Sequence, residues 1–120
     1  MYKRQLYSNT TGIQNSAVGV NALYYNTTGS YNSAVGVNAL QNNTTGSNSV
    51  AIGYCSLYNS NATGNNIAVG FCAGAAITTG VNNVVIGSYT GSAAPISATG
   101  SNYIILADGC LLYTSPSPRD

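Results

Sequence analysis

Charged residues are almost absent from this chain of 120 residues. Lys, Arg, Asp and Glu together make up 4% of the sequence, against roughly 25% in an ordinary soluble domain, and the net charge is +1. Proteins that bind nucleic acid carry a basic patch facing the phosphates, so we expect no nucleic acid among the partners of this chain. The charged residues all lie near the two ends of the sequence: Lys3, Arg4, Asp108, Arg119 and Asp120.

Histidine is absent, which excludes the common catalytic triads and pairs that depend on an imidazole. Asp108 is the only carboxylate between residues 6 and 109, so this region lacks the carboxylate pair of a glycosidase. We expect Asp108 to form a turn. Three cysteines are too few for a zinc site with about four Cys or His ligands. We therefore expect no enzymatic activity, no metal and no other cofactor.

Long apolar runs are missing as well. A membrane-spanning helix needs about 20 consecutive apolar residues, and Asn, Thr, Ser or Gly interrupts every apolar stretch here. Disordered chains combine low hydrophobicity with high net charge, whereas 44% of these residues are hydrophobic. The composition predicts a folded chain with no membrane span in this fragment.

The two ends differ from the middle of the chain. Residues 1–5 and 110–120 hold all three basic residues and two of the three prolines. Both segments resemble translated sequencing-adapter sequence, which has to be excluded from reasoning about the fold. We expect residues 6–109 to be the natural sequence, an internal fragment of a longer product. The alternative is that the last segment is a genuine flexible tail.

Glycine recurs at a fixed interval, which is the signature of a repeat protein. One column of glycines has a constant interval of 17, and Ala107 takes the next place after 20. In a second column each glycine directly follows a threonine, and the intervals between these glycines are 17, 17, 18, 16 and 20. We interpret the 18 and the 16 as one inserted residue that is compensated by a deletion directly after it. The first column is Gly19, Gly36, Gly53, Gly70 and Gly87, and the second is Gly12, Gly29, Gly46, Gly64, Gly80 and Gly100.

A short strand precedes each glycine of the first column. Residues 15–19 and 32–36 both read Asn-Ser-Ala-Val-Gly, and later copies keep the alternation of period two. Such strands, joined by turns every eight or so residues, are too short for helices or βαβ units. Stacked copies can bury what one copy cannot. The sequence therefore predicts an all-β, parallel β-roll or β-solenoid of about six coils of 17 residues over 6–109.

Each strand has a face of large side chains and a face of small ones. We predict that the large residues, such as Val18 and Val35, fill the coil, and that the small ones, such as Ala17 and Ala34, let another chain approach closely. Because a narrow coil has little interior, we expect identical chains to complete the structure, most simply as a homotrimer. The alternative is a monomer that packs the small residues on its own second strand.

Several polar residues follow the same period. Cys55 and Cys72 continue the column of Asn21 and Asn38, so we predict a ladder of small side chains there, with a disulfide as the alternative. The tyrosines are expected to pack or face solvent, and contact with sugars is the alternative. Five sequons match the glycosylation pattern but follow the repeat, so we expect them to form corners: Asn9, Asn26, Asn42, Asn43 and Asn61.

Residues 48–53, Asn-Ser-Val-Ala-Ile-Gly, resemble the head repeat of trimeric autotransporter adhesins, known as the YadA-head or haemagglutinin/invasin repeat. The longer pattern of Asn-Ala-Leu at 38–40 and Asn-Thr-Thr-Gly-Ser at 43–47 is similar to repeats of phage tail fibres. The resemblance implies a left-handed, homotrimeric β-roll on a bacterial surface or in a virion tail fibre, and Tyr103 to Gly109 resembles the transition out of such repeats. The interval of 17 and an insertion around 92–95 depart from the shorter adhesin repeat.

We therefore expect a structural segment of a trimeric surface or virion fibre that mediates adhesion to a cell-surface receptor, either a glycan or a protein. Two alternatives stay open at this point. An ice-binding solenoid would show flat ranks of threonine, and Thr10, Thr27, Thr44 and Thr78 form a rank that Ala62 interrupts. A non-catalytic part of a carbohydrate-active fibre would have its acidic cluster outside this fragment.

Overall fold

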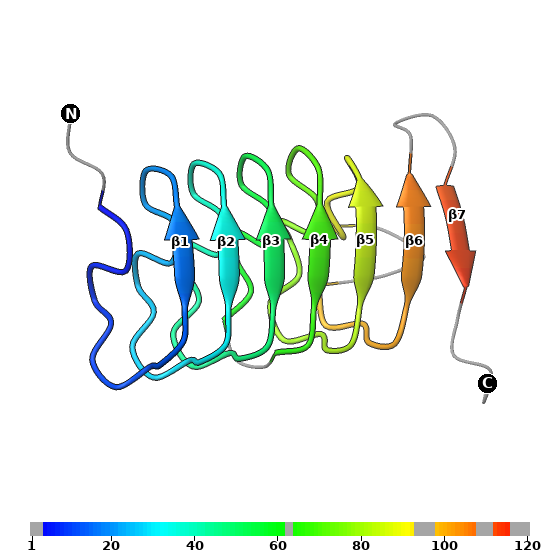
Figure 1. The fold of residues 1–120 in the computed structure, drawn as a ribbon. Coiled ribbons are helices and arrows are strands. Elements are labelled where there is room, and N and C mark those ends of the chain that lie inside the picture. Colours follow the sequence, from blue (N-terminus) through cyan, green and yellow to red (C-terminus); the bar gives the residue numbers. More distant parts are fainter. Residues whose placement is uncertain (1–3, 62–63, 93–97, 108–111, 116–120) are drawn as a thin grey trace.

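The computed structural model describes residues 4–61, 64–92, 98–107 and 112–115. It is an all-β chain whose strands form one sheet in sequence order, β1 to β7 (Figure 1). The segments between the strands pass behind this sheet and return the chain to the start of the next strand (Figure 1). The strands are β1 (Ser16–Val18), β2 (Ser33–Val35), β3 (Val50–Ile52), β4 (Ile67–Val69), β5 (Val84–Gly87), β6 (Ile104–Ala107) and β7 (Leu112–Ser115).

The pairing of β1 to β6 is parallel throughout and follows the register of the repeat. Ala17 of β1 lies beside Ala34 of β2, and Ala34 lies beside Ala51 of β3. The last step, from β5 to β6, is longer, because Gly87 pairs with Ala107. This arrangement confirms the predicted parallel β-solenoid, whose turns each correspond to one copy of the repeat. β7 departs from the repeat, because it pairs antiparallel with β6.

The segments behind the sheet are also bonded from coil to coil. The amide of Ser8 donates to the carbonyl of Tyr24 at 3.0 Å, and the amide of Tyr25 donates to Gln41 at 3.0 Å. The same pattern continues with Asn42 donating to Tyr58 at 3.1 Å. Backbone groups on both sides of the coil are thus satisfied by the neighbouring coil, as buried amides and carbonyls require.

The first column of glycines forms the corner after each strand, in single file as predicted. Gly36 has a φ of +135°, a value that favours glycine. A Cβ added there would lie 2.5 Å from the carbonyl oxygen of Gly53 in the next coil, which is closer than carbon and oxygen can approach. The glycine is required both by the turn and by the close stacking of successive corners.

The second column of glycines is regular except at one member. An added Cβ at Gly29 would meet the carbonyl of Gly46, and one at Gly80 would meet that of Gly100. Gly64 lies instead beside Ser47, its counterpart one full repeat earlier, so the described residues keep a constant interval across this point and do not show the predicted compensated insertion. The insertion that we predicted around residues 92–95 lies mostly outside the described residues.

The prediction of which strand face fills the coil is wrong. Ala34, Ala51 and Ala68 are completely buried, whereas Val18 is 57% exposed and Ile52 is 42% exposed. The physical reason lies in the opposite wall of the coil, where a column of leucines that includes Leu40 occupies the interior. Only alanine fits between that column and the sheet, so the larger residues face outward.

Along the interior, residues on one wall become smaller while residues on the opposite wall become larger. The leucine column, which has φ values near +50°, ends at Leu57, and glycine takes its place in the next coils, at Gly74 and Gly91. The inward residue of the strand grows over the same coils, from Ala68 to Val85 and Ile105. Ile77 lies next to both glycines and fills the remaining space. The volume lost with the leucine side chain is thus partly offset by larger residues at neighbouring positions.

Asparagine ladders line the rest of the interior. Asn32 is completely buried, and its side-chain amide donates to the carbonyl of Gly46 at 2.7 Å while its oxygen accepts from the amide of Ser49 at 3.0 Å. Asn66 repeats this bonding with Gly80 at 2.8 Å and Asn83 at 3.0 Å. Each asparagine thus ties the strand entry of its own coil to both the turn and the strand entry of the next coil.

A second ladder runs beside the first and ends at a serine. The side-chain amide of Asn43 donates to the side-chain oxygen of Asn26 at 2.7 Å and to the backbone carbonyl of Gly46 at 2.9 Å. Both asparagines are buried. Ser60 takes the next place in this column, and its buried hydroxyl has no hydrogen-bond partner among the described residues.

We expect Gly36→Ala to lower the free energy of unfolding by at least about 2 kcal/mol, because it adds both a steric overlap and a strained φ. Chemical denaturation followed by circular dichroism measures the change. Ser33→Ala, on the outer face of β2, is the control and should change stability by less than about 0.5 kcal/mol. A fully stable Gly36→Ala variant would contradict the stacked corner.

Asn43→Ala and Ser60→Ala form a matched pair in one column. We expect Asn43→Ala to cost about 2–4 kcal/mol of unfolding free energy, because it leaves the Gly46 carbonyl and the Asn26 oxygen buried without that donor. Ser60→Ala should leave stability unchanged or raise it by up to about 1 kcal/mol, because it removes an unpaired buried hydroxyl. Equal losses in the two variants, measured by denaturation, would contradict the ladder.

Candidate functional site

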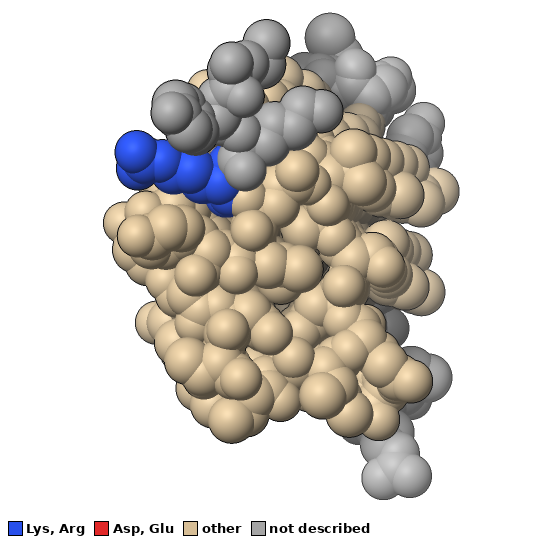
Figure 2. Space-filling view, turned by 60° about the vertical axis from the view of Figure 1, so that its left-hand side comes forward, with Lys and Arg blue, Asp and Glu red and all other residues tan. Residues whose placement is uncertain are grey.

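The described surface carries very little charge. Arg4 is the only Lys, Arg, Asp or Glu among the residues that the structure describes, and Figure 2 shows it at one end of an otherwise uncharged face. Asp108 lies outside the described residues. Within the described ranges no three His, Cys, Asp or Glu side chains gather as a metal site would require, and no helix is long and apolar enough to cross a membrane.

Cys55 and Cys72 lie on neighbouring coils, and both thiols are free. They continue the ladder of Asn21 and Asn38 as predicted: Asn21 donates to Asn38 at 3.1 Å, and Asn38 donates to the sulfur of Cys55 at 3.8 Å. Burial, followed by the nearby Cys55, raises the pKa of the Cys72 thiol. A raised pKa reduces the thiolate fraction, so the Cys72 thiol is poorly suited to nucleophilic chemistry.

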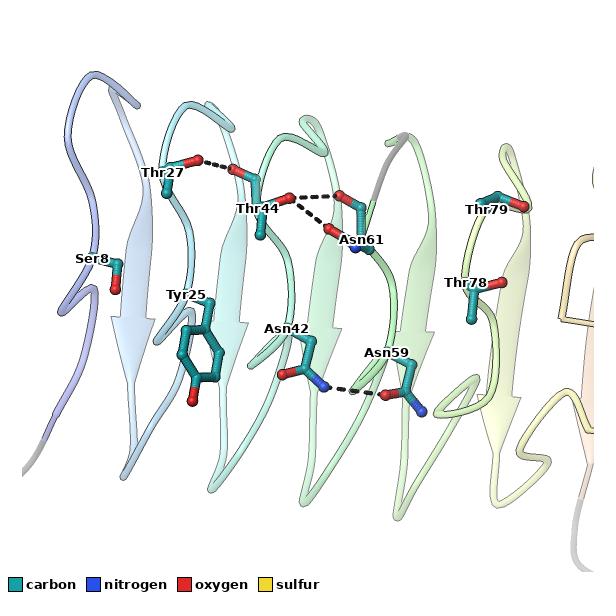
Figure 3. A pocket seen from close by; sticks show the side chains of 9 residues that line it. All are labelled: Ser8, Tyr25, Thr27, Asn42, Thr44, Asn59, Asn61, Thr78 and Thr79. Atoms are coloured by element: carbon teal, nitrogen blue, oxygen red, sulfur yellow. Dashed lines mark hydrogen bonds between the residues drawn. The ribbon is translucent and has the colours of Figure 1, made fainter.

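A groove runs across the coils on the side of the stack opposite the outer face of the sheet. Figure 3 draws its residues on the segments that pass in front of the strands, whereas the strands face the viewer in Figure 1. The cavity volume is about 640 Å³. Its lining side chains come from successive coils, one repeat apart: Ser8, Tyr25, Asn42 and Asn59 in one row, and Thr27, Thr44, Asn61 and Thr78 in the other, with Thr79 at the end.

The second row is held by bonds between coils. The hydroxyl of Thr27 donates to the carbonyl of Thr44 at 3.0 Å, and Thr10 donates in the same way to Thr27 at 3.0 Å. Thr44 bonds to Asn61, which stands one repeat further in the same row. The residue that interrupts the threonine rank is therefore Asn61, not Ala62 as we predicted from the sequence.

The first row offers more free hydrogen-bonding capacity. Asn42 donates to Asn59 at 3.1 Å, and Asn59 donates to the carbonyl of Ala75 at 3.0 Å (Figure 3 shows the first of these bonds). Each side-chain amide has two donors and an oxygen with two lone pairs, so both residues can still bond to a ligand. Among the described residues, the hydroxyls of Ser8 and Tyr25 have no hydrogen-bond partner in the protein.

Tyr25 is the aromatic residue of the groove. Its ring is 45% exposed and meets the ring of Tyr24 edge to face, with centroids 4.6 Å apart and planes at 79°. Tyr24 in turn stacks on Tyr7 at 5.0 Å. Tyr25 thus lies beside Asn42 in the row with its ring packed against that of Tyr24.

The outer face of the sheet is the second candidate surface. Its exposed apolar side chains come from each of the strands β1 to β6. A ridge beyond the glycine corners adds Val37, Tyr54 and Phe71; the last is 65% exposed and stacks on Tyr54 at 5.4 Å. Exposed apolar patches of this kind mark interaction surfaces. The residues of the face are Val18, Val35, Ile52, Ile67, Ile86, Ile104 and Leu106.

The asparagines of the sequons lie in different parts of the fold. Asn26 and Asn43 are buried in the interior ladder, so their side chains are inaccessible to glycosylation in the folded chain. Asn42 and Asn61 line the groove. Sequence reasoning assigned all of them to corners and missed both the ladder and the groove, although the recurrence of asparagine in step with the repeat, at 15, 32, 66 and 83, was a signal for a ladder.

Comparison with known proteins gives no relative: no family model, no curated protein and no solved structure matches the chain.

Replacing Cys55 provides a test of the thiol ladder. Cys55→Asn introduces the residue type that this column carries at positions 21 and 38. Asparagine also tolerates the φ of +54° at this corner. We expect the pKa of Cys72 to fall, because the neighbouring thiol is removed and an amide donor takes its place, yet to stay above that of an exposed cysteine because burial remains. The pH dependence of alkylation of the Cys72 peptide, followed by mass spectrometry, measures this, and an unchanged profile would contradict the contact.

Proposed function

We propose that the chain is a structural segment of a homotrimeric fibre, on a bacterial surface or in a virion tail, that mediates attachment to a cell. The observation that carries this proposal is the uncharged apolar face that the solenoid presents along all of its parallel strands. Free sheet surfaces and edges in soluble proteins are normally protected by charged residues. Their absence here, over so many coils, is what a covered face requires.

Trimer formation needs two different patches on each chain, because a cyclic trimer uses heterologous contacts. The outer face of the sheet and the ridge of Val37, Tyr54 and Phe71 provide two such patches. Six strands about 4.8 Å apart and about three residues wide give a strip of roughly 300 Å². A stable interface buries about 800 Å² per partner, so a stable complex would use both patches and would gain from further coils.

The resemblance of residues 48–53 and 38–47 to adhesin and tail-fibre repeats supports the same assignment. In such a fibre the coil would be left-handed, and its mechanical role would be that of a stiff spacer, since each coil is bonded to the next on both of its sides. The receptor, whether glycan or protein, would contact the surface that trimer formation leaves free.

The ice-binding alternative has less support. Ice-binding faces need flat, regular ranks of threonine, and the groove has one such row, interrupted by Asn61. The neighbouring row holds Ser8, Tyr25, Asn42 and Asn59 in place of threonine. The hydroxyls of Thr10 and Thr27 already donate to carbonyls of the next coil.

The assembly state tests the proposal. We expect the purified chain to form a species of three times the 12.2 kDa of one chain in analytical ultracentrifugation. Ile52→Lys places a charge in the apolar face and should weaken association at least about tenfold. Asn42→Lys, on the groove side, is the matched control and should leave association unchanged. A monomer at all concentrations, or equal effects of both lysines, would overturn the proposal.

A further inference from the structure

The groove opposite the sheet face has a chemistry of its own, and we propose that it binds a neutral, linear glycan whose chain lies along the solenoid axis. This inference deepens the proposed attachment function and rests on it, since it names the ligand of the surface that trimer formation leaves free. The groove is lined by amide, hydroxyl and aromatic side chains from five successive coils.

The ligand is neutral because nothing in the groove can attract or balance a charge. All of its lining residues are Ser, Thr, Asn or Tyr. Arg4 is the only cation in the described part of the chain, and it is not among the lining residues. Acidic glycans and nucleic acids depend on Lys and Arg for most of their affinity. A sugar without charges loses nothing from this lack.

Hydroxyl groups of a sugar are complementary to what the groove offers. Sugar hydroxyls both donate and accept hydrogen bonds, and the side-chain amides of Asn42 and Asn59 do the same. Their mutual bond of 3.1 Å fixes both amides in orientation before a ligand arrives. A fixed orientation lowers the entropy cost of binding. The free hydroxyls of Ser8 and Tyr25 add further partners at the end of the same row.

Tyr25 supplies the apolar part of the site. One face of a pyranose ring exposes C–H groups that pack on an aromatic ring, and Tyr25 is partly exposed, packed edge to face with Tyr24 and next to Asn42 in the row (Figure 3). A single aromatic residue followed by two amides along the groove predicts that one sugar unit stacks while the following units are bound through hydrogen bonds.

The repeat of the groove explains why the glycan is a chain. Equivalent side chains recur with the spacing of the coils, about 4.8 Å, and a sugar unit of an extended glycan is of similar length. A linear chain can therefore place successive units against successive coils. A peptide strand is a weaker candidate, because the coil backbones bond to one another along the groove and leave no free sheet edge there.

Binding to an array of linear oligosaccharides of increasing length, both neutral and acidic, tests the proposal on the full chain. We expect binding to neutral oligosaccharides, with an affinity that rises up to about four or five units and then levels off. Tyr25→Ala should abolish most of the binding, whereas Tyr25→Phe should retain the stacking and lose little. The double variant Asn42→Ala with Asn59→Ala should weaken binding at least about fivefold.

The matched control is a second exposed asparagine pair, Asn65 and Asn82, which bond to each other at 3.2 Å across neighbouring coils and do not line the groove. Both have a positive φ, of +64° and +58°, so glycine replaces them without strain. This control variant should bind as the unaltered chain does. Thermal unfolding of all variants shows whether the fold is intact.

Three outcomes would overturn the proposal: no neutral oligosaccharide binds, only acidic ones bind, or the groove and control variants are affected alike. Ultracentrifugation of the same samples separates this result from the assembly proposal. A trimer without glycan binding rejects the groove ligand alone, and a monomer that binds glycan rejects the trimer alone.

Discussion

The structure depends on one constraint, the hydrogen bonding of each coil to the next in the constant register of the repeat. In this register nearly every side chain lies next to its own counterpart, as Ala34 lies beside Ala51 and Asn26 beside Asn43. Residue types that pack or hydrogen-bond well with an identical residue in the next coil are therefore favoured. Asparagine forms ladders, and glycine allows corners to stack. Like charges would lie about 4.8 Å apart and repel by roughly 1 kcal/mol per pair even in water, which disfavours columns of like charge along the repeat.

The same constraint sets the volume of the interior. Leucine on one wall leaves room only for alanine on the other, and where Gly74 replaces leucine, Ile77 and then Val85 make up the volume. Interiors packed to crystal-like density tolerate such exchanges only when the total volume is kept. The leucines also adopt φ values near +50°. That strain persists because the complete burial of Leu23, Leu40 and Leu57 offsets it.

Much of the fold could be predicted from the sequence, because the interval between Gly19 and Gly36 and the alternation within each strand depend only on local chemistry. Which strand face points inward could not, since Val and Ala alternate equally well in either orientation. The answer lies with Leu23 and Leu40 on the far wall, and only the closed coil brings them opposite the strand. Similarly, Thr-Gly at 63–64 resembles Thr-Gly at 45–46, yet the backbone register places Gly64 beside Ser47. The groove combines residues of five coils, so no single copy of the repeat displays it.

A solenoid built on self-pairing acquires surfaces that are periodic along its axis, and this limits what such surfaces can recognise. The apolar face of the sheet repeats Val or Ile in each coil, so its natural counterpart is another surface with the same period, such as a further copy of this chain. The groove differs, because the side chains within one of its rows change from Ser8 and Tyr25 to Asn42 and Asn59 while the spacing between coils stays constant. Constant spacing with varied side chains suits a polymer whose units are equal in length and whose contacts differ from unit to unit. The two opposite sides of the stack can thus serve assembly and recognition separately, because neither set of residues takes part in the other surface.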